Sequence, residues 1–307
     1  MKTIVTHLNP DLDAMSSVWL LKRFLPGWEE AEVRFVPAGI YKQAVSSKKK
    51  VLSNDDEETL VVDTGFGELD HHQTDEKTCA AMLVREYIKN KLEYSSTRQL
   101  AGRSSRPAKR DSNNKINEEA IERLVNVVLR IDYGAEDITI KNAEDDFFAF
   151  LFNERQIIRG LRTLYRGQSD KQLNIGMTIL DAIYEVLKAK IEAEEIISVG
   201  LKFKTIWGEA VAAETNNEIY MHLAQQKGYK VVVSKDPKKG HIRIHALPKR
   251  GIDFTNIYEV LKKKDPEATW YLHSSKALLL NGSSANPDMR PTRLNLEEVI
   301  EVLKSKT

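Results

Sequence analysis

The chain has almost no cysteine: Cys79 is the only one among 307 residues. A single thiol excludes an internal disulfide framework and a metal cage built from thiolates, and it fits a reducing cytoplasm. A long apolar run is also missing, because His7 and Asp11 interrupt the N-terminal one. Neither a signal peptide nor a membrane span is therefore expected. We predict a cytoplasmic protein with no membrane partner.

An excess of charge of either sign is missing as well. Lys and Arg total 46, Asp and Glu total 45, and the formal net charge is +1. No global basic field therefore attracts nucleic acid, and local groups must bind any charged partner. The length predicts about two domains, each long enough to bury its own core.

Residues able to carry chemistry gather first near the N-terminus. Residues 3–6 predict a buried strand, because β-branched side chains dominate and the turn signal Asn9-Pro10 follows. His7 then stands at the carboxyl end of that strand, where ligands bind in open α/β sheets. Asp11 and Asp13 follow, two residues apart, and a helix is expected to begin near Asp13. In an alternative interpretation, Asn9 and Asp11 only shape a turn and Asp13 caps the helix.

Further segments bring side chains of the same kinds. The strand predicted at residues 59–65 contains Asp63, Asp70-His71-His72 follows it, and an amphipathic helix over 116–129 leads into Asp132. Each of these groups stands at a strand end or a helix end. Together they can hold two cations that share one carboxylate: His7, Asp11, Asp13, Asp63, His71 with His72, and Asp132.

The ligand types indicate the metal and the chemistry. Oxygen-rich ligands with a few imidazoles and no thiolate favour Mn²⁺, with Mg²⁺, Co²⁺ or Fe²⁺ as competitors. Two such ions make a nucleophile from water at neutral pH and neutralise a phosphoryl oxygen. The sequence therefore predicts phosphoester hydrolysis.

The sequence pattern changes near residue 196, which we take as a domain boundary. Residues 1–195 predict an α/β domain with a parallel sheet, including a strand over 31–38 and helices over 79–88, 143–165 and 171–195, the last being a connector. The polar residues 95–117 predict a loop or a disordered insertion. Residues 196–307 predict a smaller mixed α/β domain, with strands over 201–213, 229–234, 241–247, 269–273 and 277–280 and helices over 217–226, 254–264 and 296–303.

Candidate substrate-binding residues lie in the second domain. Arg243 and His245 alternate along one predicted strand and so share a face, and Arg250 follows them. They could bind a phosphate or nucleotide, or they could form an ordinary solvated face. Asn281-Gly282 could form a backbone nest for a phosphate or an ordinary turn, and His273 completes the candidate set.

The ordered series of motifs resembles the DHH phosphoesterase superfamily, over most of the first two thirds of the chain. The series is His7-x-Asn9-Pro10-Asp11-x-Asp13-Ala14, Val61-Val62-Asp63, Asp70-His71-His72 and Ile131-Asp132. That superfamily includes RecJ exonucleases, nano-RNases, exopolyphosphatases and manganese-dependent inorganic pyrophosphatases. The resemblance implies one ion on His7, Asp11 and Asp63, and a second on Asp13, Asp63, His71 and Asp132. It also implies that Asp63 bridges the ions, that His72 faces the scissile phosphate and that Asp70 orients the site.

A closer resemblance is to the Myg-type exonuclease branch. It rests on Asp70-His71-His72-Gln73, on Ile131-Asp132-x-Gly134 and on the tail His273-x₄-Leu278-x₂-Asn281-Gly282. The chain departs from that branch in its first motif, which is similar to the pyrophosphatase and nano-RNase form, and it lacks a Gly-Gly-Gly-His segment.

Three functions follow from these resemblances. The leading one is hydrolysis of phosphodiester bonds in short or single-stranded nucleic acid, with release of 5′-mononucleotides, in a cleft between the domains. The alternative is a phosphatase for a small compound such as pyrophosphate or a nucleotide. A third is a protein of this fold that binds a nucleotide without hydrolysing it, which the intact ligand set disfavours. The sequence also leaves open whether the protein forms a homodimer.

Overall fold

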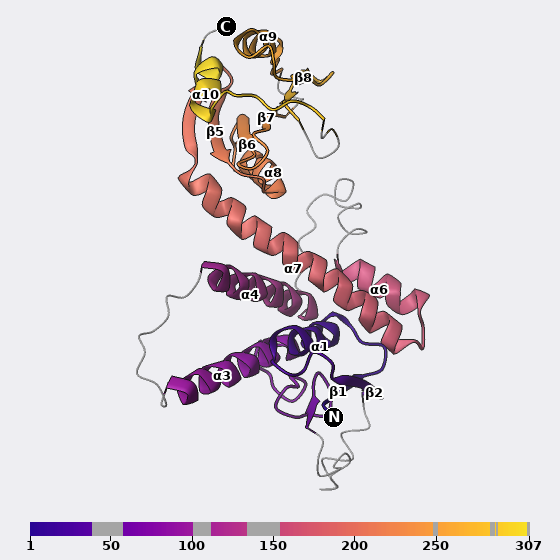
Figure 1. Ribbon diagram of the computed structural model, residues 1–307. Coiled ribbons are helices and arrows are strands. Elements are labelled where there is room, and N and C mark those ends of the chain that lie inside the picture. The colour runs from indigo at the N-terminus through magenta and orange to yellow at the C-terminus, as the bar shows by residue number, and fades with distance from the viewer. Residues whose placement is uncertain are drawn as a thin grey trace, which may run out of the picture. The chain divides into compact units, whose positions relative to one another are not determined.

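The computed structural model describes residues 1–38, 58–100, 112–133, 154–247, 251–282, 286 and 288–305. The chain divides into two compact units, Met1–Glu185 and Val186–Thr307 (Figure 1). The division falls within one long helix, α7 (Ser169–Val199), ten residues before the boundary that we took from the sequence. Both units are mixed α/β. Within the described residues, no helix has the length and the apolar content needed to cross a membrane.

Unit 1 contains a small parallel sheet in the order β2-β1-β3. Its strands are β1 (Thr3–His7), β2 (Glu32–Val36) and β3 (Thr59–Val61), which confirms the three strands expected from the sequence. In the central strand, Ile4 and Val5 are both fully buried. Consecutive buried residues are typical of a parallel strand that is covered on both faces. The sheet therefore presents the carboxyl ends of its three strands at one edge.

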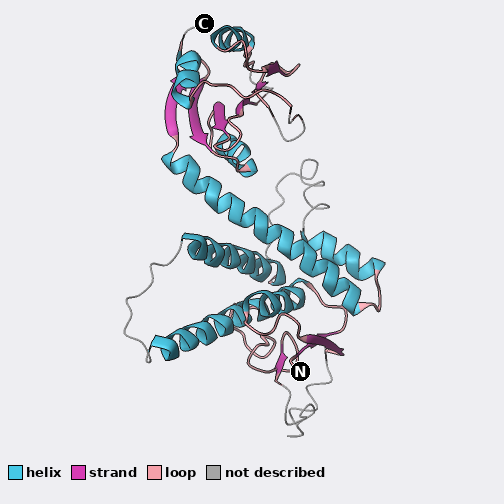
Figure 2. Ribbon diagram, in the orientation of Figure 1, coloured by secondary structure: helices cyan, strands magenta, loops and turns pink. Residues whose placement is uncertain are grey.

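Helices make up most of unit 1 (Figure 2). They are α1 (Leu12–Phe24), α3 (Ala80–Leu100), α4 (Ser112–Asp132), α6 (Glu154–Leu164) and the first part of α7. Every residue of α1 from Leu12 to Leu21 is buried, and α1 packs on β1, α3 and α4. α7 also comes close to α1, because a Cβ atom at Gly176 would collide with the Met15 side chain. α1 is therefore the central helix of this unit.

The polar residues 95–117 are helical at both ends, where we expected a loop. α3 continues to Leu100 and α4 begins at Ser112; the residues between them lie outside the described part. Arg, Lys and Gln are good helix formers, so a polar composition does not exclude a helix. Of the helix expected over 143–165, the structure describes α6.

Unit 2 contains a six-stranded mixed sheet in the order β4-β5-β6-β7-β9-β8. Only β5 and β6 are parallel neighbours. The elements are β4 (Leu201–Thr205), β5 (Gly208–Glu214), α8 (Glu218–Gln226), β6 (Val231–Lys235), β7 (Ile242–Ala246), α9 (Thr255–Lys264), β8 (Tyr271–Leu272), β9 (Leu278–Leu280) and α10 (Leu296–Lys304). The single strand expected over 201–213 is thus the hairpin β4–β5, whose turn requires the positive φ of Gly208 (122°).

Each face of this sheet has its own core. One core joins alternate residues such as Val233 and Ile244 to α9 and α10. The other joins Val211 and Val232 to α8 and to the end of α7. Because side chains alternate along a strand, the two cores use neighbouring residues of the same strands. Arg243 and His245 of β7 lie between core residues and are half-buried.

Asn281 ties three segments of unit 2 together from a fully buried position after β9. Its Nδ2 donates to the carbonyl oxygens of Thr269 (2.9 Å) and Arg290 (3.0 Å), and its Oδ1 accepts from the Thr292 amide (2.6 Å). The whole side-chain amide is therefore used inside the fold. Asn281, a substrate-binding candidate from the sequence, is a fully buried residue and is not accessible to a substrate.

Replacing Asn281 with Ala should destabilise unit 2 by about 2 to 3 kcal/mol, because buried backbone groups lose their partners. Chemical denaturation would measure the change. The matched control is Asn216→Ala, an exposed position that should change stability by less than about 0.5 kcal/mol. A similar, small effect for both variants would show that the Asn281 bonds do not hold this unit together.

Candidate metal centre

Asp63 follows β3 in a sharply turning segment. Asp63 itself has a positive φ of 51°, and Phe66 has one of 55°. The amide of Asp63 donates to the carbonyl oxygen of Leu69 (3.0 Å), and the Asp63 side chain is only 2% exposed. Non-glycine residues with positive φ concentrate at functional sites, where the surrounding structure holds them in place. The backbone here fixes where the carboxylate points.

The two carboxylate oxygens of Asp63 face different histidines. Oδ2 lies 3.4 Å from His7 Nε2, and Oδ1 lies 3.5 Å from His71 Nε2. Oδ1 is buried, and within the described residues it has no hydrogen-bond partner. A buried oxygen without a partner is costly, so this atom fits a bound cation.

The remaining predicted ligands lie around these histidines. His7 Nε2 is 3.9 Å from Asp11, and His71 Nε2 is 3.6 Å from Asp13 and 3.7 Å from Asp132. Three groups offer ligand atoms within 4.8 Å of one another: His7, Asp11 and Asp63; Asp13, His71 and Asp132; and Asp63, His71 and His72. All six residues that we expected to bind metal are thus brought together in unit 1.

Asp11 and Asp13, at the start of α1, make different hydrogen bonds. Asp11 caps α1, since its Oδ1 accepts from the Ala14 amide (3.1 Å). The alternative interpretation, in which Asp13 caps its own helix, is wrong. Instead its oxygens accept from the amides of Ala80 (2.7 Å) and Ala81 (2.8 Å) at the start of α3. The N-terminus of a helix stabilises negative charge, so α3 supports a carboxylate of the cluster.

Hydrogen bonds orient two of the histidines. The Nδ1 of His7 lies 2.9 Å from the carbonyl oxygen of Leu8, which leaves Nε2 for the cluster. The Nδ1 of His72 lies 2.6 Å from Asp70 Oδ1, while Asp70 Oδ2 accepts from the Phe66 amide (2.6 Å). Asp70 is buried, whereas the His72 side chain is 54% exposed. Asp70 therefore holds His72 at the accessible side of the cluster.

Crowded charges shift the protonation of the cluster. Burial and the negative charge of Asp63 raise the pKa of Asp13 to about 8. The nearby carboxylate of Asp63 raises the pKa of His71 to about 9. Burial alone would lower the pKa of His7, but Asp11 and Asp63 outweigh it and raise the pKa to about 10. Protons thus offset the carboxylate charge, and divalent cations would replace them.

Two pockets border the cluster. One, of about 270 Å³, is lined by His7, Asp63 and His72 among others. The other is lined by Asp11, Asp13 and Asp132 together with Arg159 and Arg162 of α6. Neither arginine was expected from the sequence, because nothing there separates them from the other polar residues of a predicted helix. Only the packing of α6 reveals them.

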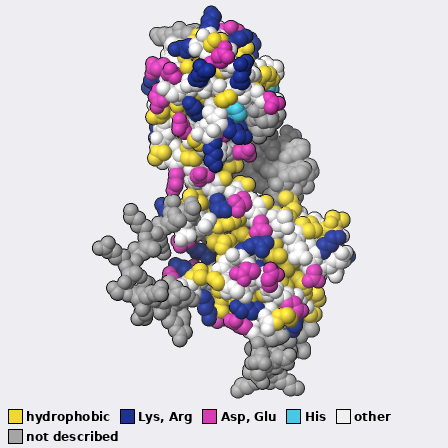
Figure 3. Space-filling model, in the orientation of Figure 1, with side chains coloured by type: hydrophobic (Ala, Val, Ile, Leu, Met, Phe, Trp, Pro, Cys, Tyr) yellow, Lys and Arg dark blue, Asp and Glu magenta, His cyan; other side chains and the backbone are white. Residues whose placement is uncertain are grey.

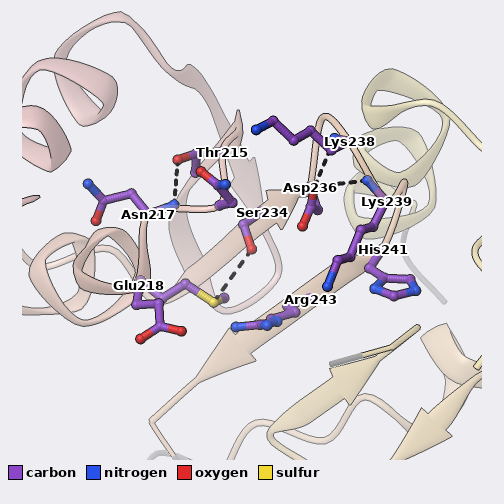
Figure 4. A pocket seen from close by; sticks show the side chains of 11 residues that line it. Thr215, Asn217, Glu218, Ser234, Asp236, Lys238, Lys239, His241 and Arg243 are labelled. Atoms are coloured by element: carbon purple, nitrogen blue, oxygen red, sulfur yellow. Dashed lines mark hydrogen bonds between the residues drawn. The ribbon is translucent and has the colours of Figure 1, made fainter. Parts of the chain in front are cut away.

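Unit 2 has a basic pocket of its own (Figure 4). Arg243 lines it from β7, and Asp236 lies on the turn between β6 and β7, where its carboxylate accepts from the amides of Lys238 (2.8 Å) and Lys239 (2.9 Å). His241 lines the same pocket. The cavity of about 290 Å³ is thus lined by three cationic side chains, Lys238, Lys239 and Arg243, and by the carboxylates of Glu218 and Asp236.

The other substrate-binding candidates do not line this pocket. His245 lies beside Arg243 on β7, and burial lowers its pKa. Gly282 makes room for the ring of His241, with which a side chain would collide. His273 is exposed and its Nδ1 lies 2.9 Å from the Ser275 hydroxyl. Arg250 lies outside the described residues.

No family model matches this chain. Among solved structures, the crystal structure of an uncharacterized protein from Helicobacter pylori G27 aligns over 99% of this chain and 98% of that chain, with 11% identity and a TM-score of 0.25. A TM-score this low supports no statement about fold or function.

The metal-free protein should become less stable as the pH rises from 6.5 to about 9. His7 and His71 have pKa values raised above 6.5, and that of Asp13 is raised above 3.8, so the folded state binds more protons than the unfolded chain. Their contribution is complete below the unfolded pKa values and is lost through the folded ones. Calorimetry in chelator should therefore show a falling Tm.

Adding Mn²⁺ should raise the Tm, and more at pH 8 than at pH 6.5, because fewer protons compete for the ligands. Titration calorimetry in buffers of different ionisation enthalpy would count the protons released. The control His7→Gln should flatten the pH dependence. A Tm that changes neither with pH nor with added Mn²⁺ would contradict a metal centre here.

Proposed function

We propose that unit 1 is the catalytic domain of a DHH-type phosphoesterase that uses two divalent cations, with Mn²⁺ as the favoured ion. The observation that carries this proposal is Asp63, whose two oxygens face two different groups of ligands while one of them has no hydrogen bond among the described residues. A carboxylate shared in this way is the feature that a two-cation site needs.

The ligand sets follow from the groups around Asp63. His7, Asp11 and Asp63 would hold one ion, and Asp13, Asp63, His71 and Asp132 would hold the other. This donor set is rich in oxygen and has two imidazoles, which suits Mn²⁺ better than a thiolate-seeking metal. When bound, such ions supply an activated water at neutral pH and neutralise charge on a phosphoryl oxygen.

His72 and Asp70 would hold a proton that can be donated to the substrate. The carboxylate of Asp70 lies 2.6 Å from His72 Nδ1, so it holds a proton on that nitrogen and orients the ring. The half-exposed ring faces the pocket that contains His7 and Asp63. From there His72 can donate a hydrogen bond to a phosphoryl or leaving-group oxygen.

The substrate class that we propose is short or single-stranded nucleic acid, cleaved to 5′-mononucleotides. The pocket of unit 2 supports a substrate that carries several phosphates, because its three cationic side chains outnumber its two carboxylates. Basic and acidic side chains are interspersed on the visible face of unit 2 (Figure 3), so the described residues of that face form no broad basic surface for a long duplex.

A small-molecule phosphatase is the second candidate. The observation that favours it is the pocket beside Asp63 and His72, whose volume of about 270 Å³ lies just below the usual range for small-molecule sites. Pyrophosphate or a nucleotide would be its substrate.

Asp63→Asn should reduce Mn²⁺-dependent hydrolysis by more than about a hundredfold, beyond the loss usual for residues that only support a ligand. The fold should survive, because Asn adopts positive φ readily. Titration calorimetry should show weakened Mn²⁺ binding. The control Asp75→Asn lies in an exposed segment and should retain activity. A variant at position 63 with most of the wild-type turnover would disprove the bridging role.

Arg243→Gln should separate the two candidate substrates. If unit 2 binds oligonucleotides, this variant should weaken binding of a short RNA and lower its salt dependence, since fewer counterions are released. Pyrophosphate hydrolysis should suffer less. The control Arg293→Gln changes an exposed arginine that does not line the pocket. Equal losses on both substrates, or turnover of pyrophosphate alone, would favour the small-molecule phosphatase.

A further inference from the structure

Two arginines of α6 stand beside the carboxylate cluster. Arg159 and Arg162 line a pocket of about 220 Å³ that is also lined by Asp11, Asp13 and Asp132. The arginines are three residues apart, so they lie on the same side of the helix. Both are exposed, and neither takes part in an ion pair within the part of the chain that the structure describes.

In the metal-free protein, Arg162 interacts electrostatically with Asp11. Cations bound to the cluster would leave both arginines without a counterion among the described residues. A guanidinium keeps its charge at every physiological pH. The cluster contains four carboxylates, and two divalent cations would neutralise them. The two arginines would then make the pocket positive, with the cations on one side and the guanidinium groups on the other. An anion next to the reacting group would match this field.

The walls of the pocket indicate which anion fits. Its apolar lining is aliphatic, from Leu12, Val128, Ile131 and Ile158, and the described lining includes no aromatic side chain. Bases bind to proteins by stacking on aromatic rings, and the described lining offers no such ring. Aliphatic walls lower the local dielectric constant and strengthen a bond between guanidinium and phosphate.

We propose that Arg159 and Arg162 bind a second phosphate of the substrate, next to the one that is cleaved, in the pocket between α1, α4 and α6. This inference rests on the proposed phosphoesterase function and defines its substrate class further. The second phosphate can be joined to the first directly, as in pyrophosphate, or through a nucleoside, as in a 5′-phosphorylated dinucleotide. The two arginines are specificity-determining residues in either case.

The test compares matched substrates with Arg159→Gln, Arg162→Gln and the double variant of the full chain in Mn²⁺. One pair is a dinucleotide with a 5′-phosphate and the same dinucleotide with a 5′-hydroxyl. The other pair is pyrophosphate and p-nitrophenyl phosphate. The control is Arg166→Gln, which lies just beyond α6, is exposed and does not line the pocket.

In one of the pairs, the double variant should lose at least about tenfold more kcat/KM on the substrate with the second phosphate, as expected for charge-assisted bonds. The pair that responds identifies how the two phosphates are joined. Arg166→Gln should leave both ratios at the wild-type values. Equal losses on both members of each pair would overturn the proposal.

Binding of imidodiphosphate, which resists hydrolysis, gives a readout that does not depend on catalysis. Its Kd for the Mn²⁺-loaded double variant should rise at least about tenfold, and more than the Kd of orthophosphate. If the wild type hydrolyses none of the four substrates, the catalytic proposal fails while this titration still decides the inference. Unchanged imidodiphosphate binding in the double variant would overturn it.

Discussion

Repulsion among carboxylates is the constraint on which unit 1 depends. Asp13 and Asp63 are almost completely buried and lie around the same histidine, with Asp132 beside them. In a medium of low dielectric constant, such charges cannot all be ionised unless positive charge is close by. Protonated histidines provide it in the metal-free protein, and divalent cations would provide it more strongly. The helices and strands around the site hold these carboxylates together against their mutual repulsion.

Those supports come from segments far apart in the sequence. The first turn of α3 donates two amides to Asp13. The start of α7 holds the turn after β1, where the amide of Asn9 donates to the Ser169 hydroxyl (3.0 Å) and Gln172 donates to the Asn9 side chain (3.3 Å). Further along α7, Asp181 accepts from Trp19 of α1 (2.7 Å). The ligands on β1 and α1 are thus fixed from two sides.

The sequence predicted much of this, and the gaps have physical reasons. The strands, and the convergence of His7 and Asp63, follow from apolar runs that end in polar groups, because the ends of parallel strands meet. The pairing of Asp13 with the start of α3 could not be predicted, since it joins residues 67 positions apart and depends on packing. Arg159 and Arg162 were missed for the same reason. Asn281 was misjudged because a polar residue before a glycine gives no sign of burial.

Asp13 gives the site a mechanical consequence. Its carboxyl group faces His71 on one side and accepts hydrogen bonds from the first turn of α3 on the other, so one ionisable group belongs to both the cluster and a helix of 21 residues. Neutralising that carboxylate would weaken the hydrogen bonds that order the start of the helix. Amide hydrogen exchange at Ala80 and Ala81 would then report the charge state of the cluster. The exchange rates of these two amides would therefore depend on whether cations or protons neutralise the carboxylates of the cluster.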